Sequence, residues 1–120
     1  MLEHEIQEPV VLDGDGGADI FRTVADAERY VERVDIEAGV YTAYDAAGRL
    51  LNLWPAYRSN YGGKLSLPEP PEDRSEELAA ALRTMLGHVA AARAVRFDAS
   101  QLHEKSLDQL VRLSASYFTK

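Results

Sequence analysis

The sequence predicts an α+β fold, in which a mainly antiparallel sheet of about four to six strands is covered by three helices on one face. Two observations carry this prediction. Strand-like segments dominate the first half of the chain, around a clear β-hairpin at residues 35–54, whereas amphipathic helical patterns dominate the second half. The expected order of elements is β-β-α-β-β-(β)-α-(β)-α.

The hairpin at residues 35–54 is the best-defined local signal. Asp45-Ala46-Ala47-Gly48 has aspartate first and glycine last, as a type I turn followed by a positive-φ glycine requires. Side chains of the incoming strand alternate between its two faces. The return strand covers Arg49–Trp54, with Leu51 and Leu53 on one face and Leu50, Asn52 and Trp54 on the other. Pro55 has no N–H and is expected to end the pairing. A two-stranded hairpin is marginal alone, so other elements must cover it.

Further strands are expected on both sides of this hairpin. Gln7–Leu12 is apolar around Pro9, which is typical of an edge strand, and Ala18–Arg22 would be its hairpin partner. Lys64–Leu67 alternates and predicts a fifth strand, and the pattern of Ala94–Asp98 favours one more.

The turn between the first two strands has alternating acidic residues that superficially resemble a calcium loop. An EF-hand loop needs glycine at position six and glutamate at position twelve. Counted from Asp13, these positions hold Ala18 and Val24. The sequence therefore predicts a tight hairpin turn here rather than a metal site.

Three helices are expected, each with its own start signal. Thr23 is a suitable N-cap with Asp26 three residues later, and Val24, Ala27, Val31 and Val34 form an apolar stripe, which predicts a helix of about three turns. Asp73 and Glu76 form a capping box before Leu78, Leu82, Met85 and Val89. Ser106 and Gln109 form another before Leu107, Leu110, Val111, Ser114 and Phe118.

Composition limits the classes of function. The chain of 120 residues has no cysteine, which excludes thiolate catalysis and disulfides, and it fits one domain spanning residues 1–120.

The net charge of −7 is unevenly distributed along the chain. Residues 1–45 hold 12 acidic and three basic residues, whereas residues 46–120 hold 8 acidic and 10 basic residues. An acidic half disfavours nucleic acid and favours a basic partner, although it is also typical of a surface that only confers solubility. No apolar run of membrane-spanning length and no signal-peptide pattern is apparent, so we expect a cytoplasmic protein without a membrane partner.

No residue pattern indicates catalysis or metal binding. His4, His88 and His103 are far apart and lack convergent partners, and no serine lies in a Gly-x-Ser-x-Gly elbow. Gly62-Gly63 leads into a strand-like run rather than the helix that a phosphate loop needs. We therefore expect no catalytic residues, metal or cofactor, and a protein that is not an enzyme.

Two segments are candidates for contacts with a partner. Residues 54–61, at the end of the central hairpin, contain Trp, Tyr and Arg, which are residue types enriched in binding hot spots, and the preferred candidates among them are Tyr57, Arg58 and Tyr61. The acidic candidates are Asp26, Glu28, Glu32, Asp35 and Glu37. Glu28 and Glu32 also fit the solvated face of a helix, and Trp54 also fits a core position at the end of a strand.

The run FRTVADAERYVERVDIEAGVYTAYDAAGRLLNL, at residues 21–53, resembles a family of small, mostly uncharacterised bacterial proteins. The similarity lies in an Ala-Glu-Arg/Tyr helix, an Asp-containing turn and a Tyr-x-Ala-Tyr-Asp-x-x-Gly-Arg hairpin, with Ser106–Val111 near the end. Such proteins are similar in size and style to immunity proteins of bacterial toxin systems. The resemblance implies a non-enzymatic module that binds and neutralises a cognate toxin. The alternative is a homodimer or larger homo-oligomer that acts as a scaffold or regulatory domain.

Overall fold

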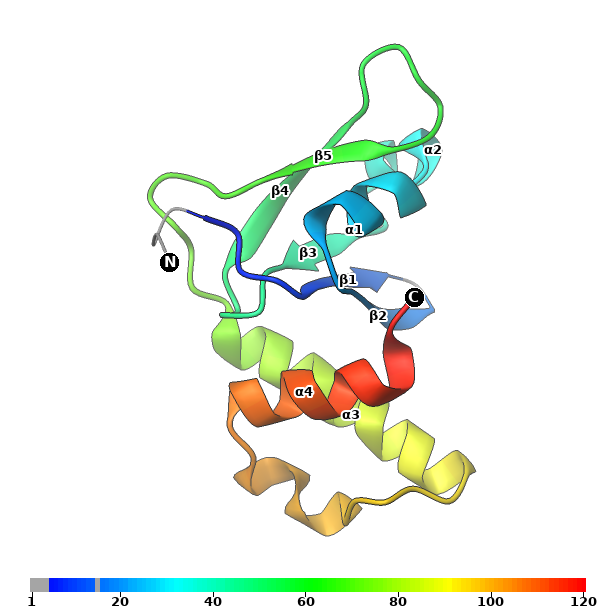
Figure 1. Cartoon of the computed structure of the whole chain (residues 1–120), viewed down its shortest axis with the longest axis vertical. Coiled ribbons are helices and arrows are strands. Elements are labelled where there is room, and N and C mark those ends of the chain that lie inside the picture. The colour runs from blue at the N-terminus through cyan, green and yellow to red at the C-terminus, as the bar shows by residue number, and fades with distance from the viewer. Residues whose placement is uncertain (1–4, 15) are drawn as a thin grey trace.

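The computed structural model describes residues 5–14 and 16–120, and its centre is a five-stranded antiparallel sheet (Figure 1). The strands lie in the order β2-β1-β3-β4-β5. Their bounds are β1 Val10–Gly14, β2 Gly17–Phe21, β3 Thr42–Tyr44, β4 Leu50–Pro55 and β5 Gly63–Ser66. The α+β prediction is therefore confirmed, and so are the two predicted hairpins and the strand near residue 64.

The first strand differs from its prediction in position. β1 begins after Pro9 and pairs with β2 on one side and β3 on the other, so it lies inside the sheet rather than at an edge. Because Pro9 precedes the ladder, its missing N–H costs no strand pairing. The edge strands are β2 and β5. The segment that resembled a calcium loop is the turn of this hairpin, with Gly14 opposite Gly17; Asp15 lies outside the described residues.

The central hairpin forms at the predicted turn. The Gly48 N–H donates to the Asp45 carbonyl at 3.0 Å, and Ala43 pairs with Leu51. Gly48 has φ +81°, and a Cβ there would lie 2.5 Å from the Cα of Ser75. The turn therefore needs glycine both for its conformation and for the close approach of the segment that starts the next helix.

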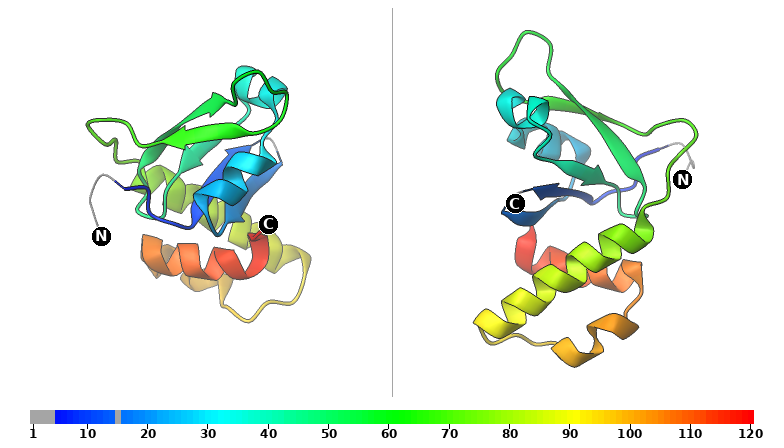
Figure 2. Two further views of the ribbon diagram at one scale, coloured as in Figure 1. Left: turned by 45° about the horizontal axis from the view of Figure 1, so that its top comes forward. Right: turned by 180° about the vertical axis from the view of Figure 1, so that it is seen from behind.

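Helices cover both faces of the sheet, so the predicted arrangement on one face is wrong (Figures 1 and 2). The helices are α1 Val24–Tyr30, α2 Arg33–Glu37, α3 Ser75–Ala92, the 3-10 helix η1 Ala99–Glu104, and α4 Leu107–Phe118. Successive strand residues point to opposite faces, and β1 is apolar on both: Val11 faces α3 and α4, whereas Val10 and Leu12 face α1. A strand that is buried on both faces accounts for the two helical layers.

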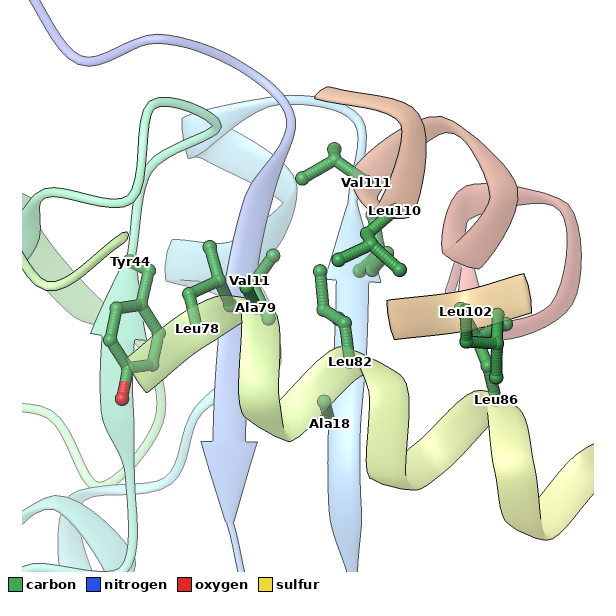
Figure 3. Packing of buried hydrophobic residues seen from close by; sticks show 11 residues of the cluster. Val11, Ala18, Tyr44, Leu78, Ala79, Leu82, Leu86, Leu102, Leu110 and Val111 are labelled. Atoms are coloured by element: carbon green, nitrogen blue, oxygen red, sulfur yellow. The ribbon is translucent and has the colours of Figure 1, made fainter. Parts of the chain in front are cut away.

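The larger core lies between the sheet and the α3/α4 layer (Figure 3). Leu78, Leu82 and Leu86 of α3 are fully buried there with Leu110 of α4. The predicted capping box of α4 is present, with Ser106 and Gln109 each bonding the other's backbone N–H. In α3 the buried stripe runs through Leu86 rather than the predicted Met85 and Val89, which are only half-buried.

The predicted helix over residues 24–34 is two short helices. Val31 and Glu32 are extended between α1 and α2, with ψ of 151° and 143°, respectively. Their backbone is bound to another part of the chain, since the Gly62 N–H donates to the Val31 carbonyl at 2.7 Å. This contact outweighs the helical pattern, turning Val34 out to solvent with 67% of its surface exposed.

Two smaller predictions were also wrong. Residues 94–98 form no strand; they are an irregular link between α3 and η1, where Phe97 packs edge-on against Tyr117. The N-cap of α3 is Arg74 rather than Asp73, and no side chain caps it. The Asp73 carboxylate instead accepts the Ser75 N–H at 2.8 Å.

Candidate functional site

Four of the five large hydrophobic side chains that are exposed among the described residues gather at one end of the molecule, and the fifth, Tyr30, lies on α1. Tyr57, Tyr61 and Val34 are 84%, 70% and 67% exposed, and Trp54 is 58% exposed. These residues belong to α2, to the end of β4 and to the loop at residues 56–62 that joins β4 to β5, at the top of Figure 1. We call α2, Trp54 and this loop the α2 end. Clustered exposed aromatic residues are typical of interaction surfaces.

Backbone hydrogen bonds attach the loop to the junction between α1 and α2. The Arg33 N–H donates to the Asn60 carbonyl at 2.9 Å, and Glu32 forms an antiparallel bridge with Tyr61. The Arg33 guanidinium adds a bond from Nη1 to the Ser59 carbonyl at 3.3 Å. These contacts bring two candidates from distant parts of the sequence, Glu32 and Tyr61, side by side.

An open depression of about 400 Å³ lies at this junction. Its lining residues are Glu32, Arg33, Val34, Glu37, Asn60 and Tyr61. The Arg33 Nε donates to Glu37 Oε1 at 2.7 Å, whereas no cation of the described residues lies within ion-pair distance of the Glu32 carboxylate. The depression therefore combines an excess of negative charge with an exposed aromatic ring.

The other acidic candidates are occupied within the protein. Asp26 pairs with Arg29 in the next turn of α1. The Glu28 carboxylate accepts a hydrogen bond from the Leu65 N–H at 2.7 Å. This side chain therefore covers the outer edge of β5. Asp35 accepts a long bond of 3.5 Å from the Tyr41 hydroxyl, and the pKa of Tyr41 is raised by burial and then by this carboxylate. These three carboxylates therefore have structural contacts, and only Glu32 and Glu37 line the depression.

Tyr57 and Arg58 lie in the loop but outside the depression. The Arg58 guanidinium sits over the Tyr57 ring, with Cζ 5.1 Å from its centroid, and Arg58 has φ +55°. Positive φ is uncommon for a residue with a side chain, so the loop holds Arg58 in a strained conformation. Both side chains project from the loop and are exposed.

Trp54 and Asn60 lie at this end of the molecule within the candidate segment 54–61 but were not chosen as contact residues, and neither Arg33 nor Val34 was a candidate. Trp54 pairs with Lys64 on the face of β4 opposite the buried Leu51 and the partly buried Leu53, where neither α3 nor α4 covers the strand (Figure 2). The alternation of β4 already indicated that Trp54 faces away from the leucines. Arg33, Val34 and Asn60 gave no such signal, because their position depends on the pairing of residues 31–33 with the distant loop.

Other polar clusters in the molecule are structural. Asp45 is fully buried and accepts bonds from the Gln7, Ala47 and Arg49 N–H groups and from the Arg49 guanidinium. The buried Tyr44 hydroxyl bonds to Glu77, and burial, followed by that bond, raises the pKa of Tyr44.

The residues that the structure describes give no direct sign of a metal or of a membrane span. Across residues 5–14 and 16–120, no three His, Asp or Glu side chains are placed to hold a metal ion. His88 is exposed on α3 and His103 on η1, and His4 lies outside the described residues. None of the described helices is both long and apolar enough to cross a bilayer.

Comparison with known proteins found no match: no family model, curated protein or solved structure is similar to this chain at a significant level.

Proposed function

We propose that this chain is a non-enzymatic, protein-binding module of the immunity type, which neutralises a cognate bacterial toxin by covering it. The observation that carries the proposal is the α2 end, where Tyr61 and Val34 line a depression with the carboxylates of Glu32 and Glu37, and where Tyr57 and Trp54 are also exposed. Aromatic anchors supply most of the binding free energy in many interfaces, and charge complementarity mainly increases the rate of encounter. The resemblance of residues 21–53 to small bacterial proteins supports the same class.

In this proposal the partner is a basic protein and the mechanism is steric and electrostatic. Exposed tyrosines would be buried against the partner, while the acidic first part of the chain would attract a positively charged active cleft. Such attraction between exposed charges weakens as salt is added, because counter-ions screen it over about 10 Å at 0.1 M. We therefore expect the association rate to fall with ionic strength more steeply than the dissociation rate changes.

The experiment combines genetics with capture. The gene is deleted in the organism that encodes it, beside any neighbouring toxin gene, and the full chain carrying an affinity tag is used to capture partners. We expect growth arrest that the wild-type gene relieves, and a Tyr57→Ala/Tyr61→Ala variant that neither relieves it nor retains the partner. Normal growth of the deletion strain, together with recovery of no protein partner, would contradict the proposal.

A second candidate is a homo-oligomeric scaffold, and Trp54 favours it. The indole lies on a strand face that no described helix covers, and a second copy could cover it. Sedimentation distinguishes the two: a dimer that persists at all concentrations and becomes a monomer in Trp54→Ala supports the scaffold, whereas a monomer supports the immunity-type module.

A further inference from the structure

We propose that the depression beside α2 accepts one arginine side chain of the protein partner, an inference that rests on the proposed function and specifies its chemistry. The depression is an open hollow whose volume of about 400 Å³ falls within the range of about 300–1,000 Å³ typical of small-ligand sites. It is therefore large enough for one extended side chain, and its openness suits a group presented from another protein surface.

The net negative charge of the residues that line the depression favours a positively charged ligand. Two carboxylates, Glu32 and Glu37, and one guanidinium, Arg33, line the depression, so its walls carry a net charge of −1. Arg33 cannot neutralise both acids, because its Nε is bonded to Glu37 Oε1 and its Nη1 to the Ser59 carbonyl. The Glu32 carboxylate is exposed and has no cationic partner among the residues that the structure describes. An incoming cation would meet this carboxylate first.

The remaining lining residues favour arginine over lysine. Tyr61 has an exposed ring and Val34 an exposed apolar side chain, and guanidinium groups stack on such surfaces while donating in their own plane. Carboxylates accept a guanidinium through two parallel bonds, which an ammonium group cannot form. The loop already contains a guanidinium stacked on an aromatic ring, since Arg58 lies over Tyr57.

The site is held in place before a partner arrives. Glu32 and Tyr61 are joined by their backbone bridge, and Arg33 links the wall of α2 to the loop through its backbone N–H and its side chain. A partner would therefore order few additional groups on this side of the interface. Preorganisation of this kind raises affinity by lowering the entropic cost of binding.

The test uses blocked peptides as probes of the full chain. Acetyl-Gly-Arg-Gly-amide is titrated at low ionic strength, beside the citrulline peptide, which keeps the shape without the charge, and the lysine peptide. Backbone amide resonances of Val34, Asn60 and Tyr61 report binding. We expect saturable shifts at these three residues, strongest with arginine, weaker with lysine and absent with citrulline.

Charge-matched variants decide whether the binding is local. Glu32→Gln should weaken binding of the arginine peptide by about two- to fivefold, in the range of an exposed ion pair. Glu69→Gln removes the same charge from the exposed linker after β5 and should leave binding unchanged. Equal shifts with citrulline, equal loss in both variants, or shifts spread over all acidic residues would overturn the proposal.

The two proposals fail in different ways. If a captured partner binds Glu32→Gln as tightly as the wild type but loses affinity for Tyr61→Ala, the binding function stands and the arginine site is wrong. If the arginine peptide binds at Val34, Asn60 and Tyr61 while no partner protein is captured and the deletion strain grows normally, the site stands and the immunity-type function is wrong.

Discussion

The α3/α4 layer and the α1/α2 layer cover opposite faces of one sheet, but α3 buries Leu78, Ala79, Leu82 and Leu86, whereas α2 buries no residue. The helix α2 is attached by Ile36, which is partly buried against the smaller core, by backbone bonds to the loop and by Arg33. Local stability follows the number of buried apolar contacts, so the α2 end should open more readily than α3. From this comparison we propose that the α3/α4 layer maintains the fold and that the α1/α2 layer presents residues to a partner.

The largest effect is expected at the turn of the central hairpin, which lies against the start of α3. Asp45→Ala removes a fully buried carboxylate that accepts five hydrogen bonds and pairs with Arg49. Leaving the partners of a buried charge unpaired costs about 3–5 kcal/mol, so urea unfolding should show a loss of this size. Asp108→Ala breaks an exposed pair with Arg112 and should cost less than about 1 kcal/mol. Equal losses would mean that burial of Asp45 contributes little.

A pair of truncations compares the two layers directly. Leu82→Ala empties a fully buried position of α3 and should lower the free energy of unfolding by about 2–5 kcal/mol. Val34→Ala trims an exposed residue of α2 and should change it by no more than about 0.5 kcal/mol. If Val34→Ala were the more destabilising, the assignment of α2 to a contact surface would be wrong.

An intermediate effect is expected at the edge of β5. Glu28→Ala removes the carboxylate that accepts the Leu65 N–H, and a bond to a charged acceptor contributes about 1.5–3 kcal/mol. We expect faster hydrogen exchange at Leu65 and more aggregation, because the edge is uncovered. Glu32→Ala removes a neighbouring carboxylate without such a bond and serves as the control. Unchanged exchange at Leu65 in the Glu28 variant would contradict the role of this side chain.

The smallest effect is expected in the pH dependence of stability, through Asp13 on the side of the sheet that faces α3. Burial, and then the charge of Glu77, raises the pKa of Asp13 above its usual 3.8. Folding therefore favours its protonated form, and this contribution to stability is present below pH 3.8 and is lost as pH rises through the raised pKa. Asp13→Asn should stabilise the protein at neutral pH, and its advantage should vanish on acidification.

Asp98 provides a control of opposite sign. The Ser100 hydroxyl and N–H lower the pKa of Asp98, so its contribution is present above 3.8 and lost as pH falls through the lowered value. Asp98→Asn should destabilise at neutral pH, with the loss shrinking in acid. Thermal unfolding from pH 7 to pH 3 measures both. The same sign for both variants would contradict this account.

The sequence predicted those elements whose signals are local. The Asp45–Gly48 turn and the Ser106/Gln109 capping box use residues within a few positions of each other, and both are present. The break between α1 and α2, and the exposure of Val34, could not be predicted, because they depend on hydrogen bonds to residues 59–62. For the same reason the sequence offered five acidic candidates, without indicating which of them would line one depression with Tyr61.

The most direct test of the account is the affinity of a captured partner for surface variants of the two layers. Tyr57→Ala and Tyr61→Ala should each weaken binding by more than about fivefold, as expected for interface residues that contribute above about 1 kcal/mol. Asp108→Ala and Arg112→Ala, at exposed positions of α4, should bind as the wild type does. Loss of affinity in the α4 variants, with none in the tyrosine variants, would contradict the assignment of contact to the α2 end.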